Sequence, residues 1–163
     1  MADLEVSYED GIATLTMNRP EARNALSMEM RSALADVLHD IEQDSSVRCV
    51  ILQGAGQHFM AGGDVKGMGE SVKKTPEKIR KEFILRIHDL HTIMFAMRRM
   101  PKPIIASCRG AAAGAGVSMA LACDLVIASE DAFFTLAYCK IGTSPDGSSL
   151  SLIHISEPTR HHV

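Results

Sequence analysis

The most informative stretch of this sequence is GAAAGAGVSMA at residues 110–120, which follows the apolar run Ile104-Ile105-Ala106. Glycine and alanine dominate its first half, and such small residues let a ligand approach the backbone itself. The second half can open a helix, whose free N–H groups and dipole favour negative charge. We therefore expect a small-residue turn at the carboxyl end of a buried strand, where open α/β sheets bind their ligands.

A second turn of this kind is FMAGGDVKGM at residues 59–68, shortly after the apolar run at residues 49–52. Neither turn contains the phosphate loop G-x-x-x-x-G-K-[ST] or the dinucleotide fingerprint G-x-G-x-x-G. Each turn alone is a weak signal, because glycine-rich turns before helices are also common in ordinary packing. Their order and similar placement after buried strands make the pair more informative.

The remaining elements alternate between strands and helices. Asp10-Gly11 between two alternating runs predicts a β-hairpin, and further strands are expected at residues 49–52, 104–106 and 125–128. The continuous apolar run at 49–52 is typical of a strand covered on both faces. One helix is expected to begin at Ser27 and another at Thr75-Pro76. The apolar face of the first comprises Met30, Leu34, Val37, Leu38 and Ile41. Alternation of this kind indicates an α/β fold.

Composition excludes several classes of protein. The chain has 163 residues, a net charge of −3, 4% aromatic residues and no tryptophan, which argues against a nucleic-acid partner. No apolar run is long enough to span a membrane, and the acidic residues 1–5 do not predict a secretory leader. The four cysteines are widely spaced and are expected to be small buried hydrophobes in a reducing compartment, hence a cytoplasmic location.

Several segments together resemble the crotonase (enoyl-CoA hydratase/isomerase) family. They include NRPEARNAL at residues 18–26, the turn at 61–68, Pro103–Ala106, the turn at 110–120 and Cys123-Asp124. The resemblance covers residues 1–149 and implies a crotonase-like spiral of ββα units, incomplete at the C-terminus. It also implies homotrimers or hexamers that act on acyl-CoA thioesters, with coenzyme A as part of the substrate and no separate cofactor or metal. Residues 150–163 break off without completing a layer, and we expect them to be a non-native tail.

The resemblance also assigns roles to individual residues. It implies that the backbone N–H groups of Gly63 and Ala115 form an oxyanion hole for the thioester oxygen as it becomes an enolate. The surroundings of CoA are implied to be Ala22, Arg23, Ala61, Asp64, Val65 and Lys66. A solvated loop pair is the alternative for Asp64 and Lys66. The charged residues 78–82 of the second helix are expected to be solvated, with CoA phosphates as an alternative contact.

The reaction type follows from which carboxylates are present. Hydratases of the family use two glutamates, and the matching positions here are Ser118 and Tyr138, neither of which is a carboxylate near neutral pH. Asp146, after Pro145, is similar to the single acid of the enoyl-CoA isomerases. One such group can remove the C2 proton and return a proton at C4. We expect a 3-enoyl to 2-enoyl isomerase with Asp146 as its proton shuttle; a turn residue is the alternative role.

Other functions stay open at this point. A hydratase of the same family and a catalytically inactive fragment are the main alternatives. A Clp-like serine peptidase that uses Ser118 is a remote one, because a serine nucleophile needs a base within hydrogen-bond distance. His88 and His91 have helical spacing for a metal, but no third ligand follows at a matching spacing.

Overall fold

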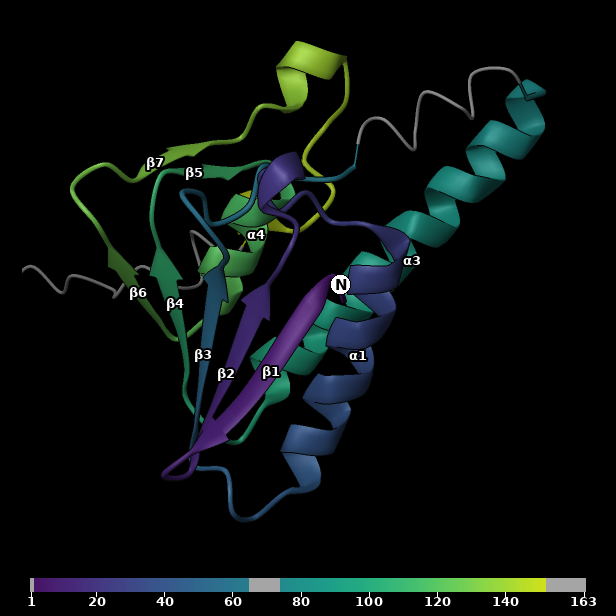
Figure 1. The fold of residues 1–163 in the computed structure, drawn as a ribbon. Helices are drawn as coiled ribbons and strands as arrows, with labels where there is room; N and C mark the ends of the chain where they lie inside the picture. Colours follow the sequence, from purple (N-terminus) through teal and green to yellow (C-terminus); the bar gives the residue numbers. More distant parts are fainter. Residues whose placement is uncertain (1, 65–73, 152–163) are drawn as a thin grey trace, which may run out of the picture.

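A computed structural model describes residues 2–64 and 74–151 of the chain. Its main sheet has five strands in the order β1-β2-β3-β4-β6. These strands are β1 (Leu4–Glu9), β2 (Ile12–Met17), β3 (Cys49–Gly54), β4 (Ile104–Cys108) and β6 (Leu125–Ala128). Strands β2, β3, β4 and β6 are mutually parallel, and only β1 runs antiparallel to its neighbour. The carboxyl ends of the parallel strands therefore meet at one edge of the sheet (Figure 1).

The N-terminal hairpin forms as the sequence predicts. Asp10 and Gly11 connect β1 to β2 with φ angles of 49° and 78°. Two consecutive positive φ values are those of a type I′ turn, whose twist matches that of the flanking strands. Arg48 Nη2 donates to the Asp10 carbonyl at 2.8 Å, so the loop before β3 also holds this turn.

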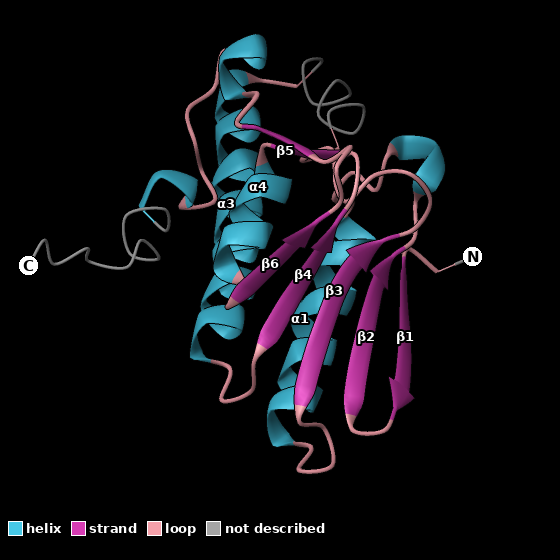
Figure 2. Ribbon diagram, turned by 90° about the vertical axis from the view of Figure 1, so that its left-hand side faces the viewer, coloured by secondary structure: helices cyan, strands magenta, loops and turns pink. Residues whose placement is uncertain are grey.

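Helices cover one face of the sheet. Figure 2 shows α1 (Met28–Gln43), α3 (Pro76–Arg99) and α4 (Ala115–Ala122) on the same side of it. Ser27 caps α1, because its Oγ accepts a hydrogen bond from the Met30 N–H at 3.0 Å. Pro76 occupies the first turn of α3, as the sequence predicts. The second half of α3 is buried against the core, whereas its first half projects beyond it (Figure 1).

The opposite face of the sheet is more open than the apolar runs suggest. In β3, Val50 and Leu52 are buried, whereas Cys49 and Ile51 are only half-buried. The expectation that this strand is covered on both faces is wrong for the described residues, because all three helices lie on one side. Strand β6 is exposed along its whole length. The cysteines differ accordingly: Cys108 and Cys123 are buried as expected, but Cys139 is exposed.

A second, two-stranded sheet lies beyond the carboxyl ends of the main strands. It pairs β5 (Ala111–Ala113) with β7 (Phe133–Thr135) in parallel. Two short 3-10 helices, η1 (Pro20–Ala22) and η3 (Tyr138–Ile141), belong to the same end of the molecule. Sequence periodicity does not detect strands of three residues, so this sheet was not predicted. No helix among the described residues has the length and hydropathy needed to cross a bilayer.

Candidate active site

The two glycine-rich turns lie against each other. Met60 donates its N–H to the Ala111 carbonyl at 3.0 Å, and Ala113 donates to the Met60 carbonyl at 2.8 Å. This bridge joins the turn after β3 to strand β5 at the start of the second turn. Glycine is required at the crossing, because a Cβ on Gly116 would overlap the Met60 carbonyl. The structure thus brings together two segments about fifty residues apart in the sequence.

A cavity of about 270 Å³ opens where these turns meet α3 and the loop after η3. Its walls include backbone from both turns, one side chain of α1, two of α3, and residues of the segment that follows β7. The lining residues are Arg31, Ala61, Gly62, Gly63, Phe83, Leu90, Gly114, Ala115, Leu136, Ala137, Tyr138, Lys140, Thr143 and Asp146. Three residues that the sequence singles out for catalysis, Gly63, Ala115 and Asp146, therefore share one cavity.

The N–H groups of Gly63 and Ala115 have no hydrogen-bond acceptor within the part of the chain that the structure describes. The neighbouring backbone groups, by contrast, already have hydrogen-bond partners. The Leu26 N–H donates to the Gly62 carbonyl at 2.8 Å, and the Gly114 N–H donates to the Thr135 carbonyl at 2.9 Å. Ala115 is the first residue of α4, so its N–H is one of the donors that a helix leaves free. Both groups are available to a ligand oxygen in the cavity.

Positive φ angles at two glycines keep the turns close. Gly62 has φ +90° and Gly114 has φ +51°, conformations that L side chains rarely adopt. A Cβ added to Gly62 would lie 3.1 Å from the Ala113 carbonyl oxygen and 3.8 Å from the Ala115 nitrogen. The backbone of the first turn thus runs directly beside the start of α4.

Asp146 forms part of another wall of the cavity. His91 Nε2 donates a hydrogen bond to its carbonyl oxygen at 2.6 Å, which attaches the loop of Asp146 to α3. The His91 side chain therefore points toward this loop and helps to hold it in position. No cluster of three or more potential metal ligands occurs in the described ranges.

Ser118 and Tyr138 occupy the two positions where the family resemblance places glutamates. Their hydroxyl oxygens lie 3.5 Å apart, and both residues are buried. Burial is the main cause that raises the pKa of Tyr138, which its hydrogen bond with Ser118 partly opposes. Tyr138 is therefore protonated near neutral pH. Tyr138 is also the only hydrogen-bond partner of the Ser118 hydroxyl among the described residues, so no histidine there activates this serine as a peptidase nucleophile.

The residues expected around CoA are only partly brought together. Ala61 lines the cavity, and its N–H donates to the Arg23 carbonyl at 2.9 Å. Ala22 and Arg23 lie at the end of η1, outside the cavity lining. Asp64 also lies outside it and accepts from Arg19 Nη1 at 3.1 Å, so Asp64 has a salt bridge rather than only a solvated position. Val65 and Lys66 lie outside the described residues.

Arg31 and Phe83 line the cavity but were not predicted as site residues. A signal for Arg31 exists in the sequence, because it precedes Leu34 and Leu38 by three and seven residues and so lies on the apolar face of α1. A charged residue on such a face is unusual unless it is paired. Phe83 carries no comparable signal, since it belongs to the apolar stripe of α3 like any core residue.

The fold and the cavity define an α/β protein with a backbone-lined ligand site at the carboxyl ends of its strands. Residues 7–155 match the family described as "Enoyl-CoA hydratase/isomerase". The chain belongs to this family, which is the crotonase family expected from the sequence.

Proteins of similar sequence support this assignment to the family. The chain is 37% identical over 145 residues to 1,2-epoxyphenylacetyl-CoA isomerase of Escherichia coli, with 85% of this chain and 52% of that protein covered. It is 38% identical over 143 residues to a probable enoyl-CoA hydratase of Rhodobacter capsulatus, with 86% and 52% covered. The chain thus spans about half the length of the curated relatives it matches.

Solved structures confirm the fold. The crystal structure of an enoyl-CoA hydratase from Polaromonas sp. JS666 superposes with a TM-score of 0.85 at 37% sequence identity. The match covers 95% of this chain and 59% of that one. The predicted crotonase-like α/β fold is therefore correct, and both isomerases and hydratases occur among the relatives.

Proposed function

We propose that this protein shifts a double bond in an enoyl-CoA from the 3 to the 2 position. The observation that carries the proposal is the shared cavity of Gly63, Ala115 and Asp146. The N–H groups of Gly63 and Ala115 hold the thioester oxygen, which gains negative charge as the C2 proton leaves. Preorganised donors of this kind stabilise the developing charge, and the loss of one typically costs about 100- to 1000-fold in rate.

Asp146 moves the proton in this mechanism. Its carboxylate takes a proton from C2, and the electron pair of the broken C–H bond forms the enolate that the two N–H groups hold. As the enolate collapses, the double bond moves to C2–C3 and C4 takes the proton from Asp146. Atoms and charge are conserved, and the carboxylate is regenerated. His91 keeps the loop of Asp146 against α3 through the carbonyl contact.

A hydratase is the second candidate, because several relatives are named as hydratases. Hydration requires a group that activates water as well as one that protonates carbon. Asp146 is the only carboxylate among the described lining residues, and the Ser118–Tyr138 pair supplies two protonated hydroxyls. This composition favours isomerisation over hydration.

The remaining features of the proposal concern the whole protein. We place CoA beside Ala22, Arg23, Ala61, Asp64, Val65 and Lys66, and we propose a homotrimer or hexamer in the cytoplasm. The contact between Ala61 and Arg23 supports the first of these statements, since it joins two of the expected CoA-binding segments.

The test is the variant Asp146→Asn, assayed with 3-enoyl-CoA and 2-enoyl-CoA. We expect isomerisation to fall by about 100- to 10,000-fold, the usual contribution of a positioned acid–base group. Asp36→Asn, at an exposed position of α1, is the matched control and should retain full activity. Undiminished isomerisation in Asp146→Asn would overturn the assignment of the base, and efficient hydration by the unmodified protein would favour the second candidate.

A further inference from the structure

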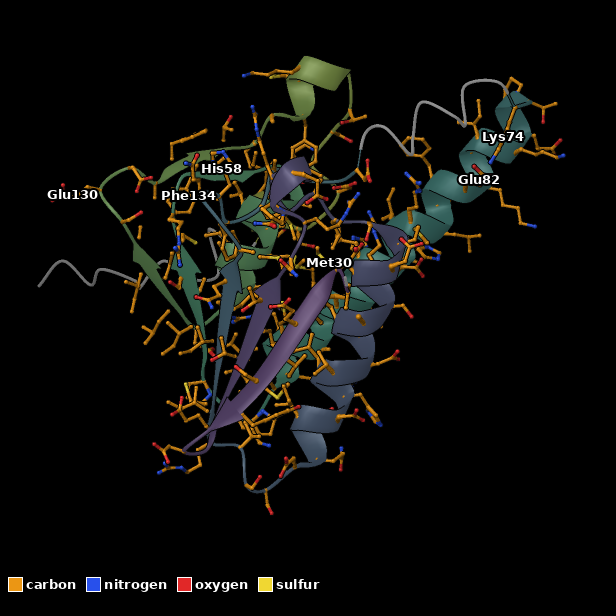
Figure 3. All side chains as sticks on the ribbon, viewed as in Figure 1. Met30, His58, Lys74, Glu82, Glu130 and Phe134 are labelled. Atoms are coloured by element: carbon orange, nitrogen blue, oxygen red, sulfur yellow. The ribbon has the colours of Figure 1, made fainter. Side chains whose placement is uncertain are left out.

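Arg31 is a buried cation in the cavity wall. Arg31 is 6% exposed and lies in the first turn of α1. It follows the buried Met30, which Figure 3 labels. It lines the same cavity as Gly63, Ala115 and Asp146. Charged side chains are rarely buried to this extent unless they are paired, because removing the charge from water is costly.

The hydrogen bonds of the Arg31 guanidinium are incomplete. Nη1 donates to the Arg86 carbonyl of α3 at 2.6 Å. Nε is enclosed and has no hydrogen-bond partner among the described residues. Nη2 has no hydrogen-bond partner among the described residues either, but it is not enclosed as Nε is, so it is the nitrogen that a ligand oxygen in the cavity can reach. The bond of Nη1 to the Arg86 carbonyl holds the guanidinium in place.

The charges near Arg31 do not supply a direct counter-ion. Burial and the neighbouring Arg86 lower the pKa of Arg31, whereas Asp89 and Asp146 raise it. The salt bridges of the described residues nevertheless involve other arginines and lysines. Lys140 is a second cation in the cavity lining, and Asp146 is its only anion there. An incoming carboxylate therefore meets two cations and one anion.

We propose that Arg31 selects acyl-CoA substrates whose acyl group ends in a carboxylate. This inference rests on the proposed function, because it assumes that the acyl group enters this cavity with its thioester oxygen at Gly63 and Ala115. The distal carboxylate accepts a charge-assisted hydrogen bond from Nη2 of Arg31. The cavity of about 270 Å³ is slightly smaller than most small-molecule sites, which suits a short acyl group.

The preference is expected to be specific for an anionic end group. A methyl group at the same place would leave Nη2 of Arg31 without a partner and without water, whereas a carboxylate forms a charge-assisted hydrogen bond with it. A site built to hydrogen-bond one end group discriminates against the analogue that lacks it. Arg31 thus acts as a specificity residue and takes no part in the proton transfer.

The test compares adipyl-CoA with hexanoyl-CoA, which have the same chain length but differ in the end group. Dissociation constants are measured by isothermal titration calorimetry on the unmodified protein, Arg31→Met and Arg31→Lys. We expect adipyl-CoA to bind at least about tenfold more tightly than hexanoyl-CoA to the unmodified protein. Arg31→Met should abolish this preference while leaving the affinity for hexanoyl-CoA within about twofold, and Arg31→Lys should retain part of it, because it keeps the charge but not the guanidinium Nη2 donor.

The outcomes separate the two proposals. Equal affinity of the unmodified protein for the two thioesters overturns the role of Arg31 alone, whatever the variants do. Binding of neither thioester overturns the proposed function as well. Arg80→Met, at an exposed position of α3, is the control for loss of an arginine and should keep the preference. An equal loss of preference in this control would attribute the effect to general charge and contradict the proposal.

Discussion

At the scale of single residues, the end of β4 carries a thiol that resists ionisation. Cys108 is the last residue of β4 and is buried, and burial raises its pKa from 9.0 to about 11. Between these two pH values the unfolded chain loses the thiol proton while the folded chain keeps it. The folded state then binds more protons, so the free energy of unfolding falls as the pH rises.

Replacement of this thiol should make stability less dependent on pH. In Cys108→Ala, the decline in the free energy of unfolding between pH 9 and pH 11 should be smaller by up to about 2 kcal/mol, which corresponds to the shift in pKa. Urea unfolding at pH 8, 9 and 11 measures it. Cys139→Ala, at an exposed position, serves as the control and should follow the unmodified protein. Parallel pH profiles for all three proteins would contradict the account.

Individual site residues were predictable to different degrees. Gly63, Ala115 and Asp146 were assigned through the family resemblance, because the glycine-rich turns and the Pro-Asp-Gly loop are weak signals when each is taken alone. Arg31 was missed although it lies on the apolar face of α1, because that position does not show whether the side chain meets the core or a cavity. Whether a side chain faces a cavity depends on packing between distant elements, and Arg31 gains its role only when the Arg86 carbonyl fixes it.

At the scale of elements, the crossing of the two turns determines the shape of the site. Met60 forms an isolated β-bridge with β5 through its hydrogen bonds to Ala111 and Ala113. Helix α4 begins beside this bridge. Helix α4 can start there only because Gly116 presents no side chain to Met60. Ala115, the first residue of this helix, lines the cavity, and its N–H has no acceptor among the described residues.

A side chain at Gly116 should therefore separate the turns. We expect Gly116→Ala to lower the free energy of unfolding by about 1–3 kcal/mol, as overpacking in a well-packed core does, and to impair catalysis as well. Gly142→Ala is the comparison, because its Cβ would meet no atom within 4 Å and its cost comes only from a φ of +69°. Thermal unfolding measures both. A smaller loss in Gly116→Ala than in Gly142→Ala would contradict the steric explanation.

Most elements were predictable from local patterns. The hairpin at Asp10-Gly11, the cap at Ser27 and the start of α3 at Pro76 are set by adjacent residues, and all three are confirmed. The small β5–β7 sheet was not, because strands of three residues have no measurable period. The partial exposure of β3 was also unpredictable, since an apolar run does not reveal how many faces of a sheet receive helices.

At the scale of the whole molecule, the described part of the chain leaves one edge of the sheet open and apolar. In β6, the consecutive residues Leu125, Val126 and Ile127 are all exposed, with Ile127 at 64%. Consecutive strand residues point to opposite faces, so both faces of this strand are uncovered. Phe133 and Phe134 of β7 are exposed as well, and Figure 3 labels Phe134. Exposed apolar edge strands favour association with another chain.

We expect the protein to self-associate through β6. Ile127→Lys should weaken this association, because an edge lysine places a charge in the contact. Sedimentation velocity over a range of protein concentrations measures the change. Ile84→Lys, at an exposed apolar position of α3, is the matched control and should leave the association intact. An equal effect of both variants would show that β6 is not the contact.

The acyl-thioester site depends on whether one carbonyl oxygen accepts from both Gly63 and Ala115. Infrared difference spectroscopy of a bound acyl-CoA with a ¹³C-labelled thioester carbonyl measures this, since hydrogen bonds lower the carbonyl stretching frequency. The account predicts a lower frequency for the bound thioester than for the same thioester in water. It also predicts partial reversal in Ala115→Pro, which removes the N–H at a first helical position that accepts proline, but not in Ala115→Ser. A bound carbonyl at the frequency found in water would contradict it.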